Sequence, residues 1–243
     1  MEKSRLVTWE IQDSIGIMTI DNPPQNRLTE AVFVDPESFH RWIADDALKG
    51  IIVTGKGRHF SAGADLDRLR SIAADKSLLM TSIHEGKEFL ADFEALPVPT
   101  IAAIEGACFG GGLEIALACH LRICSTNALL AFPEANHAIM PGMGGTVRLP
   151  GLIGHGKALE MILAGDIVNA PRALEIGLID HVSPPKEALK FSIALMKKMV
   201  ARRHVEVIRS IVRALNNSRT MTVQQAMVEE TKMFCRLAMK AHE

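Results

Sequence analysis

The 243-residue sequence has no long block of charges of one sign and no long apolar run. Its 27 basic and 28 acidic side chains nearly balance, so nothing favours nucleic acid as the main partner. No stretch reaches the ~18 consecutive apolar residues that a membrane-spanning helix needs, and residues 1–10 are not followed by an apolar segment long enough for a secretion signal. We therefore expect a soluble, cytoplasmic protein with no membrane partner, and an organellar matrix stays open as an alternative.

Cysteine is scarce, and the four cysteines have no C-x-x-C spacing. Three of them lie in or beside apolar segments, where cysteine commonly acts as a small hydrophobe, which favours a reduced compartment. No group of His, Cys and carboxylate residues has the spacing of a metal site. Neither Ser61 nor Cys108 has an identifiable base and orienting partner, which argues against a covalent nucleophile. We expect no metal and no cofactor beyond the substrate.

Short apolar runs alternate with helical patterns, which favours an α/β architecture. Strands are expected at residues 6–11, 16–20, 50–54, 100–105 and 120–125. Asp35-Pro36 should begin a helix, because aspartate caps well and proline suits the first turn. After residue 185 the sequence changes to three helical patterns, at 186–202, 204–216 and 220–241. We therefore divide the chain into a core, residues 1–185, and a C-terminal helical region, residues 186–243.

Residues 109–118 read FGGGLEIALA, in which three consecutive glycines run into an apolar helical pattern with one carboxylate, Glu114. Glycines at a helix start let the backbone approach a ligand closely, and the unpaired N–H groups there favour a developing negative charge. A carboxylate is costly to bury among apolar neighbours without a role. The combination indicates an oxyanion hole beside an acid/base.

Two further segments have related character. Residues 57–66, GRHFSAGADL, follow an apolar run and predict a strand, a glycine-bounded loop and a helix. Downstream, FPE at residues 132–134 precedes IMPGMGGT at residues 139–146, so Glu134 is a second carboxylate in an apolar setting, 20 residues after Glu114 (134 − 114 = 20).

Together these segments resemble the enoyl-CoA hydratase/isomerase (crotonase) superfamily, whose members show F-x-A-G-A-D-L, G-x-x-x-G-G-G-x-E, and P-E followed by G-I-x-P-G-x-G-G-T. Residues 20–28, IDNPPQNRL, look like the family's N-P-P-x-N-x-L, and the resemblance extends over nearly the whole chain. It implies a spiral of ββα units followed by a C-terminal helical region that packs between subunits, giving a homotrimer or a homohexamer. The helical stripes at residues 186–241 are equally compatible with an ordinary core.

The resemblance also implies site residues. The backbone amides of Ala64 and Gly111 should point at a thioester oxygen, Glu114 should activate water at the β-carbon, and Glu134 should protonate the α-carbon. Coenzyme A, as part of the substrate, is expected to bind at Arg27, Ala62, Ala64, Asp65, Leu66, Gly110 and Gly111. Arg27 stands where the family has a small residue, so a phosphate contact and a solvent-exposed role are equally compatible with it. An acyl carrier protein could replace free coenzyme A.

Reversible syn hydration of a 2-enoyl thioester is the reaction that two carboxylates favour. Isomerisation of a 3-enoyl to a 2-enoyl thioester needs only Glu134 and is the main alternative. Decarboxylation or hydrolysis of a related thioester also stays open, and a non-catalytic thioester-binding subunit is disfavoured by the two glutamates. We expect His59, His120 and His137 to be structural or to line the pocket, whose shape is the feature least fixed by the sequence.

Overall fold

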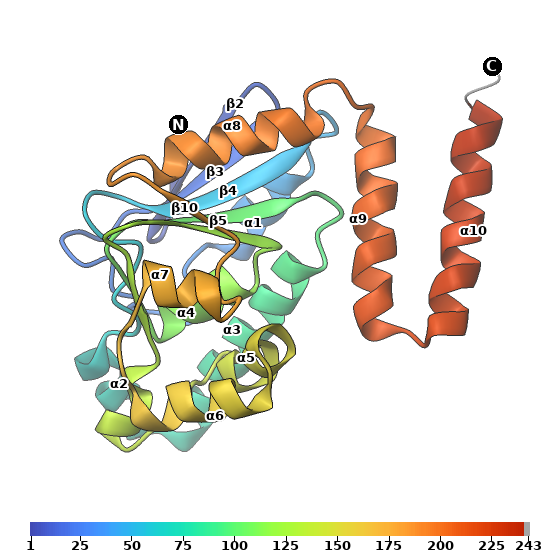
Figure 1. Ribbon diagram of the computed structural model, residues 1–243. Helices are drawn as coiled ribbons and strands as arrows, with labels where there is room; N and C mark the ends of the chain where they lie inside the picture. Colours follow the sequence, from blue (N-terminus) through green and yellow to red (C-terminus); the bar gives the residue numbers. More distant parts are fainter. Residues whose placement is uncertain (241–243) are drawn as a thin grey trace.

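A seven-stranded sheet forms the centre of the computed structural model, which describes residues 1–240 (Figure 1). Its strands lie in the order β1 (Glu2–Ser4), β2 (Val7–Gln12), β3 (Ile15–Ile20), β4 (Gly50–Gly55), β5 (Thr100–Ile104), β7 (Leu121–Ser125) and β10 (His181–Ser183). Pairing is antiparallel from β1 to β3 and parallel from β3 to β10. All five predicted strands are confirmed, with ends within one or two residues.

A second, three-stranded sheet holds β6 (Ala107–Phe109), β8 (Leu129–Ala131) and β9 (Val168–Asn169), in the order β6-β8-β9. The helices before residue 180 are α1 (Pro36–Ile43), α2 (Leu66–Ala73), α3 (Lys76–Glu94), α4 (Gly111–Leu117), the 3-10 helix η1 (Pro133–His137), α5 (Gly145–Ile153), α6 (His155–Ala164) and α7 (Ala170–Glu175). Helix α1 begins where the sequence predicts, because the Asp35 carboxylate accepts a hydrogen bond from the Ser38 amide at 2.9 Å.

The large sheet is buried on both faces, as parallel strands usually are. Successive residues of a strand point to opposite faces, so Ile52 of β4 packs against α8 (Ala188–Val200) while Ile51 joins the larger core on the other side. That larger core includes Phe39 of α1, Phe93 of α3 and Leu113 of α4. Helix α4 is thereby anchored in the larger core, which holds its glycine-rich start in place.

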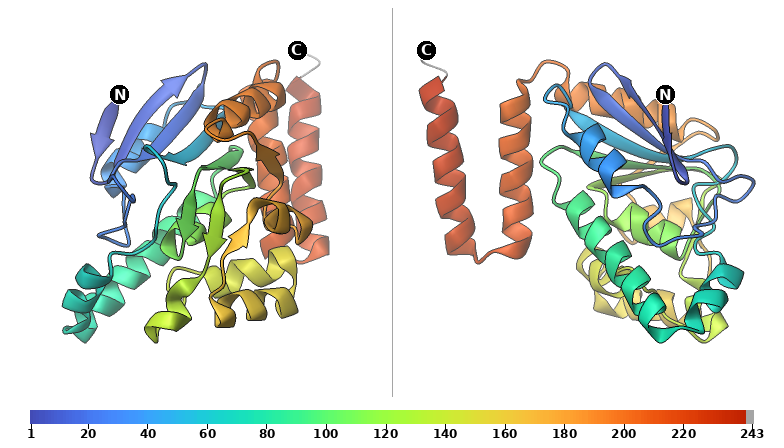
Figure 2. Two further views of the ribbon diagram at one scale, coloured as in Figure 1. Left: turned by 60° about the vertical axis from the view of Figure 1, so that its left-hand side comes forward. Right: turned by 180° about the vertical axis from the view of Figure 1, so that it is seen from behind.

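Helices α9 (Val205–Thr220) and α10 (Val223–Lys240) form an antiparallel pair that projects from the rest of the molecule (Figures 1 and 2). The three predicted C-terminal helices are confirmed, but α8 lies on the sheet, whereas α10 has no buried residue. The division near residue 185 stays a prediction. No helix within residues 1–240 has the length and apolar character needed to span a membrane.

The four cysteines differ in their environment. Cys108, Cys119 and Cys124 are buried, and Cys235 on α10 is exposed. Burial raises the pKa of Cys119 and of Cys124 to about 12, because the thiolate loses its hydration in the interior. The three buried thiols are packing groups, as the sequence indicates.

Candidate active site

The loop before α2 is joined to the strand before α4 by backbone hydrogen bonds. The Phe109 amide donates to the Ser61 carbonyl at 2.9 Å, and the Ser61 amide donates to the Ala107 carbonyl at 3.1 Å. The Ser61 hydroxyl donates to the Asn26 carbonyl at 2.7 Å and accepts from the Gly63 amide at 3.1 Å. Two segments that are almost 50 residues apart in sequence are therefore held at one place by groups fixed on strands and turns.

Gly63 allows these two segments to approach closely. Its φ is +84°, and a Cβ there would lie 2.7 Å from the Phe109 carbonyl oxygen and 3.4 Å from the Gly111 amide nitrogen. Within residues 1–240, neither the Ala64 amide nor the Gly111 amide donates a hydrogen bond, and both residues line the same cavity. An oxyanion hole requires two such free amides beside one cavity.

Glu114 is buried, with 2% of its surface exposed. One carboxylate oxygen, Oε1, accepts from the Met143 amide at 2.7 Å and from the Gly145 amide at 2.8 Å, both at the entry to α5. Burial raises the pKa of Glu114, and the two amides oppose that shift because they stabilise the carboxylate. The carboxyl group is thus oriented through one oxygen, while the other makes no hydrogen bond within residues 1–240.

Glu134 lies in η1 and is half-buried. Burial, reinforced by the charge of Glu114, raises its pKa to about 7. Its Oε2 is enclosed without a hydrogen-bond partner among the described residues. The carboxyl group lies over Gly110, where a Cβ would come within 2.6 Å of Glu134 Oε1. A carboxyl with a pKa near 7 is available in both protonation states near neutral pH.

A cavity of about 400 Å³ contains Ala64, Gly111, Glu114 and Glu134 in its lining. Most of the remaining wall is apolar and comes from α2, α3 and the segment before α5: Leu69, Ile72, Leu79, Ile83, Ile139, Met140 and Met143. A concave apolar cavity with a few converging polar groups is typical of a small-molecule site. Residues 1–240 contain no group of three or more His, Cys, Asp or Glu side chains that could hold a metal ion.

The other sequence-predicted residues lie around this cavity. Asp65 lines it and caps α2, accepting from the Arg68 amide at 2.9 Å. Ala62, Leu66, Arg27 and Gly110 are outside the lining, although Gly110 packs against the Glu134 carboxyl. The Arg27 side chain is exposed, and its Nε donates to Gln25 Oε1 at 2.7 Å.

None of the three histidines singled out from the sequence lines the cavity. His59 Nδ1 accepts from the Ala107 amide at 3.1 Å, which ties its loop to β6. His120 Nδ1 lies 2.7 Å from the Thr100 hydroxyl, and its Nε2 lies 3.1 Å from Asn216 Oδ1 on α9. Burial lowers the pKa of His120. His137 is exposed at the end of η1.

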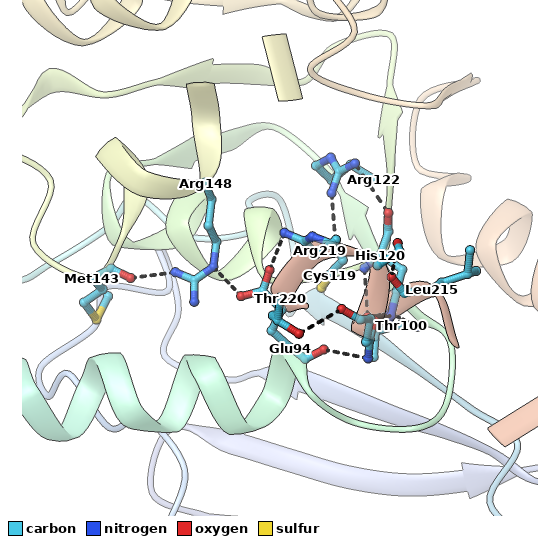
Figure 3. A network of polar contacts seen from close by, with 12 residues as sticks. Glu94, Thr100, Cys119, His120, Arg122, Met143, Arg148, Leu215, Arg219 and Thr220 are labelled. Atoms are coloured by element: carbon cyan, nitrogen blue, oxygen red, sulfur yellow. Dashed lines mark hydrogen bonds and ion pairs between the residues drawn. The ribbon is translucent and has the colours of Figure 1, made fainter. Parts of the chain in front are cut away.

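Arg148 is a residue that sequence reasoning missed. It lies in α5, is mostly buried, and donates to the Met143 carbonyl through Nη1 at 2.9 Å and to Glu94 Oε2 through Nε at 2.9 Å (Figure 3). The sequence signal for it is a single arginine in the otherwise apolar run from 147 to 153, which begins two residues after Gly145. Its partner Glu94 is 54 residues away, and no sequence pattern pairs the two residues.

A family model described as enoyl-CoA hydratase/isomerase matches residues 10–243. The chain belongs to this family. The resemblance inferred from the glycine and glutamate motifs is therefore confirmed. Among curated relatives, "Probable enoyl-CoA hydratase" of Bacillus subtilis (strain 168) is 34% identical over 232 residues, which covers 94% of this chain and 88% of the relative.

Solved structures support the same fold. An enoyl-CoA hydratase from Geobacillus kaustophilus HTA426 superposes with a TM-score of 0.89 at 30% identity, covering 97% of this chain and 89% of that one. DspI from Pseudomonas aeruginosa superposes with a TM-score of 0.87 at 33% identity, covering 98% and 90%. The expected α/β fold of the family is thus confirmed.

Proposed function

We propose that this family member is an enoyl-CoA hydratase, which adds water reversibly and in syn fashion across a 2-enoyl thioester of coenzyme A. The observation that supports this most is the meeting of two free amides and two differently held carboxyl groups in one apolar cavity. Amides can hold a thioester oxygen, and a pair of carboxyl groups can hold a water molecule while one takes and the other gives a proton.

In this mechanism the thioester oxygen lies between the amides of Ala64 and Gly111. Addition of water to the β-carbon moves charge onto that oxygen, giving an enolate-like transition state. Donors fixed in a turn and a helix start stabilise this charge without having to reorganise, and loss of one such donor typically costs ~10² to 10³ in rate. The apolar wall excludes water from the rest of the acyl group.

The environments of the two carboxyl groups favour a division of work. Glu114 receives two backbone amides, which stabilise its ionised form and suit it to accept a proton from water. Glu134 has an unpartnered oxygen and a pKa of about 7, which suits it to donate a proton to the α-carbon. The two carboxyl groups titrate as a coupled pair, because the charge of Glu114 raises the pKa of Glu134.

We further propose that the coenzyme A portion runs along residues 62–66 at the mouth of the cavity, with the exposed Arg27 available to a phosphate. An acyl carrier protein would present the same thioester, and comparison of the two thioesters as substrates separates them. The cytoplasmic location and the trimeric or hexameric assembly are likewise proposals.

The test is a hydration assay on 2-enoyl-CoA substrates with Glu114→Gln, Glu134→Gln and the exposed control Glu160→Gln. Glutamine keeps the size of the side chain but exchanges no proton at neutral pH. We expect both site variants to lose about 10² or more in hydration rate, the scale of a lost general acid or base, and the control to match wild type. Wild-type hydration in both site variants would contradict the two-glutamate mechanism.

Isomerisation of 3-enoyl-CoA is a second candidate, favoured by the unpartnered Glu134 oxygen and its pKa of about 7. A single carboxyl that shuttles a proton suffices for that reaction. Exchange of the α-proton with heavy water separates the two candidates: Glu134→Gln should abolish exchange, whereas Glu114→Gln should retain part of it. An isomerase would keep full turnover of the 3-enoyl thioester in Glu114→Gln.

A further inference from the structure

Arg148 contacts the loop whose amides orient Glu114. Its Nη1 donates to the carbonyl of Met143 at 2.9 Å, and the amide of the same Met143 donates to Glu114 Oε1 at 2.7 Å. Gly144, with a φ of +105°, packs against the guanidinium so closely that a Cβ there would collide with Arg148 Nη1. Met143 and Gly144, which lead into the second amide at Gly145, therefore contact a single, mostly buried arginine.

The other side of this arginine faces Glu94, the last residue of α3 (Figure 3). Glu94 Oε2 accepts from Arg148 Nε at 2.9 Å, and Arg219 Nη2 of α9 lies 2.7 Å from Oε1. The latter contact is an ion pair without the alignment of a hydrogen bond. Asn216 Nδ2, also on α9, donates to the Glu94 carbonyl at 3.3 Å. One glutamate thus contacts both the site loop and the projecting helical pair.

We propose that Arg148 is a positioning residue that fixes the amides of residues 143–145 for Glu114. We also propose that Glu94 connects Arg148 to helix α9. The inference rests on the proposed catalytic role of Glu114. Neither Arg148 nor Arg219 lines the cavity, so each acts through other groups. Substitution of either arginine should lower kcat more than it changes KM, because the apolar wall that binds the acyl group stays in place.

The positive charge of Arg148 also affects the pKa of Glu114. Its guanidinium and, more weakly, Lys87 of α3 lower the pKa of Glu114, against the raising effect of burial. The other charged groups that line the cavity with Glu114 are Glu30, Asp65, Arg68 and Glu134. Removing the guanidinium raises the pKa of Glu114 further. The acid limb of the turnover profile, where Glu114 must lose its proton, then moves to higher pH.

The test compares Arg148→Met, Arg148→Lys and Arg219→Met with Arg172→Met, which removes an exposed arginine paired to Glu175 in α7. We expect Arg148→Met to lower kcat by about 10²-fold, as a misplaced catalytic group does, with KM changed less than about threefold and the acid limb shifted upward. Arg148→Lys keeps the charge but cannot reach both partners, so it should restore the acid limb without restoring kcat. Arg219→Met should lower kcat a few-fold, and the α7 control should match wild type.

Hydrogen exchange of the Met143 and Gly145 amides gives a readout that needs no activity. Their exchange should accelerate about tenfold or more in Arg148→Met, while amides of Ile52 and Val53 in the buried strand β4 keep wild-type protection, which excludes global unfolding. Unchanged exchange, or faster exchange with wild-type kcat, would overturn the positioning role, and wild-type kcat in Arg219→Met would overturn the link to α9. If the wild-type protein hydrates no enoyl thioester, the proposed function fails, whereas the exchange measurement still decides whether Arg148 holds the loop.

Discussion

Glu134 illustrates how one side chain connects the site to stability. Its pKa in the folded protein is about 7, above its ordinary value of 4.5, because burial disfavours the charged form. The folded state therefore binds a proton more tightly than the unfolded state. The stabilisation is fully present below pH 4.5 and is lost as the pH rises towards 7.

This sign gives a prediction for Glu134→Gln. The variant has no carboxyl to ionise, so its Tm should exceed that of wild type at pH 8 by ~2 to 4 °C, the shift that about 1 kcal/mol produces in a chain of this size. At pH 5 the difference should shrink. Thermal unfolding at the two pH values measures it, with Glu160→Gln as the exposed control. An equal gain at both pH values would exclude the ionisation of Glu134 as the cause.

Gly110 leaves room for the Glu134 carboxyl. Its φ is +49°, and a Cβ would lie 2.6 Å from Glu134 Oε1. Gly110→Ala should therefore displace the Glu134 carboxyl and lower hydration by ~10²-fold, as other small misplacements of catalytic groups do. Gly151→Ala in α5 is the matched control, because nothing lies within 4 Å of the added Cβ and φ is not positive. A fully active Gly110→Ala would show that Glu134 tolerates a different position.

Among single residues, the sequence predicts the catalytic candidates better than the residues that hold them in position. Glu114 and Glu134 could be found because glycine motifs and apolar neighbours mark them, and the cavity contains both. The support from Arg148 could not be found, since it depends on where Glu94 ends its helix. Four of the residues expected to bind coenzyme A, Arg27, Ala62, Leu66 and Gly110, lie outside the cavity lining, so their roles stay predictions.

Among the elements, η1 ends in a strained residue. Ala138 adopts a φ of +58° and a ψ of +31°, the left-handed region that favours glycine. The strain costs an alanine roughly 1 to 2 kcal/mol, and the greater freedom of unfolded glycine offsets ~0.4 to 1 kcal/mol of any gain.

We therefore expect Ala138→Gly to stabilise the fold by about 0.5 kcal/mol in denaturant unfolding. Ala135→Gly in the same 3-10 helix should instead destabilise it, because Ala135 has no left-handed strain to relieve. Destabilisation by both substitutions would mean that the turn after η1 does not store strain.

Element prediction succeeded where the pattern was long. Buried strands such as β4 give unbroken apolar runs, and α8 to α10 give sustained helical periodicity. The strands β6, β8, β9 and β10 have two or three residues each, too few for any period to be recognised. Their positions are set by pairing with distant segments, and β6 in particular is what brings Gly111 to Ala64.

For the whole molecule, the projecting helices indicate assembly. Helix α10 exposes large apolar side chains, with Phe234 70% and Met227 61% exposed, and α9 adds Leu215. An exposed apolar surface of this kind favours burial against another copy. We expect a trimer or hexamer by light scattering, which remains a prediction from the family resemblance.

The substitution Met227→Asp combined with Phe234→Asp should reduce the mass of the assembly, because charges on that face cannot be desolvated without partners. Gln224→Asp, at an exposed polar position of the same helix, should leave the mass unchanged. A wild-type chain that stays monomeric at micromolar concentration would contradict the assembly itself.

The distribution of cysteines makes the protein suitable for site-selective labelling. A maleimide reacts with thiolates, and the three interior thiols are enclosed, with burial raising each pKa. Cys235 on α10 is the exposed thiol, so an environment-sensitive dye should attach to the projecting α9–α10 pair without any engineering of the sequence. Its emission would then report, in real time and by dilution, whether that surface is facing water or another subunit.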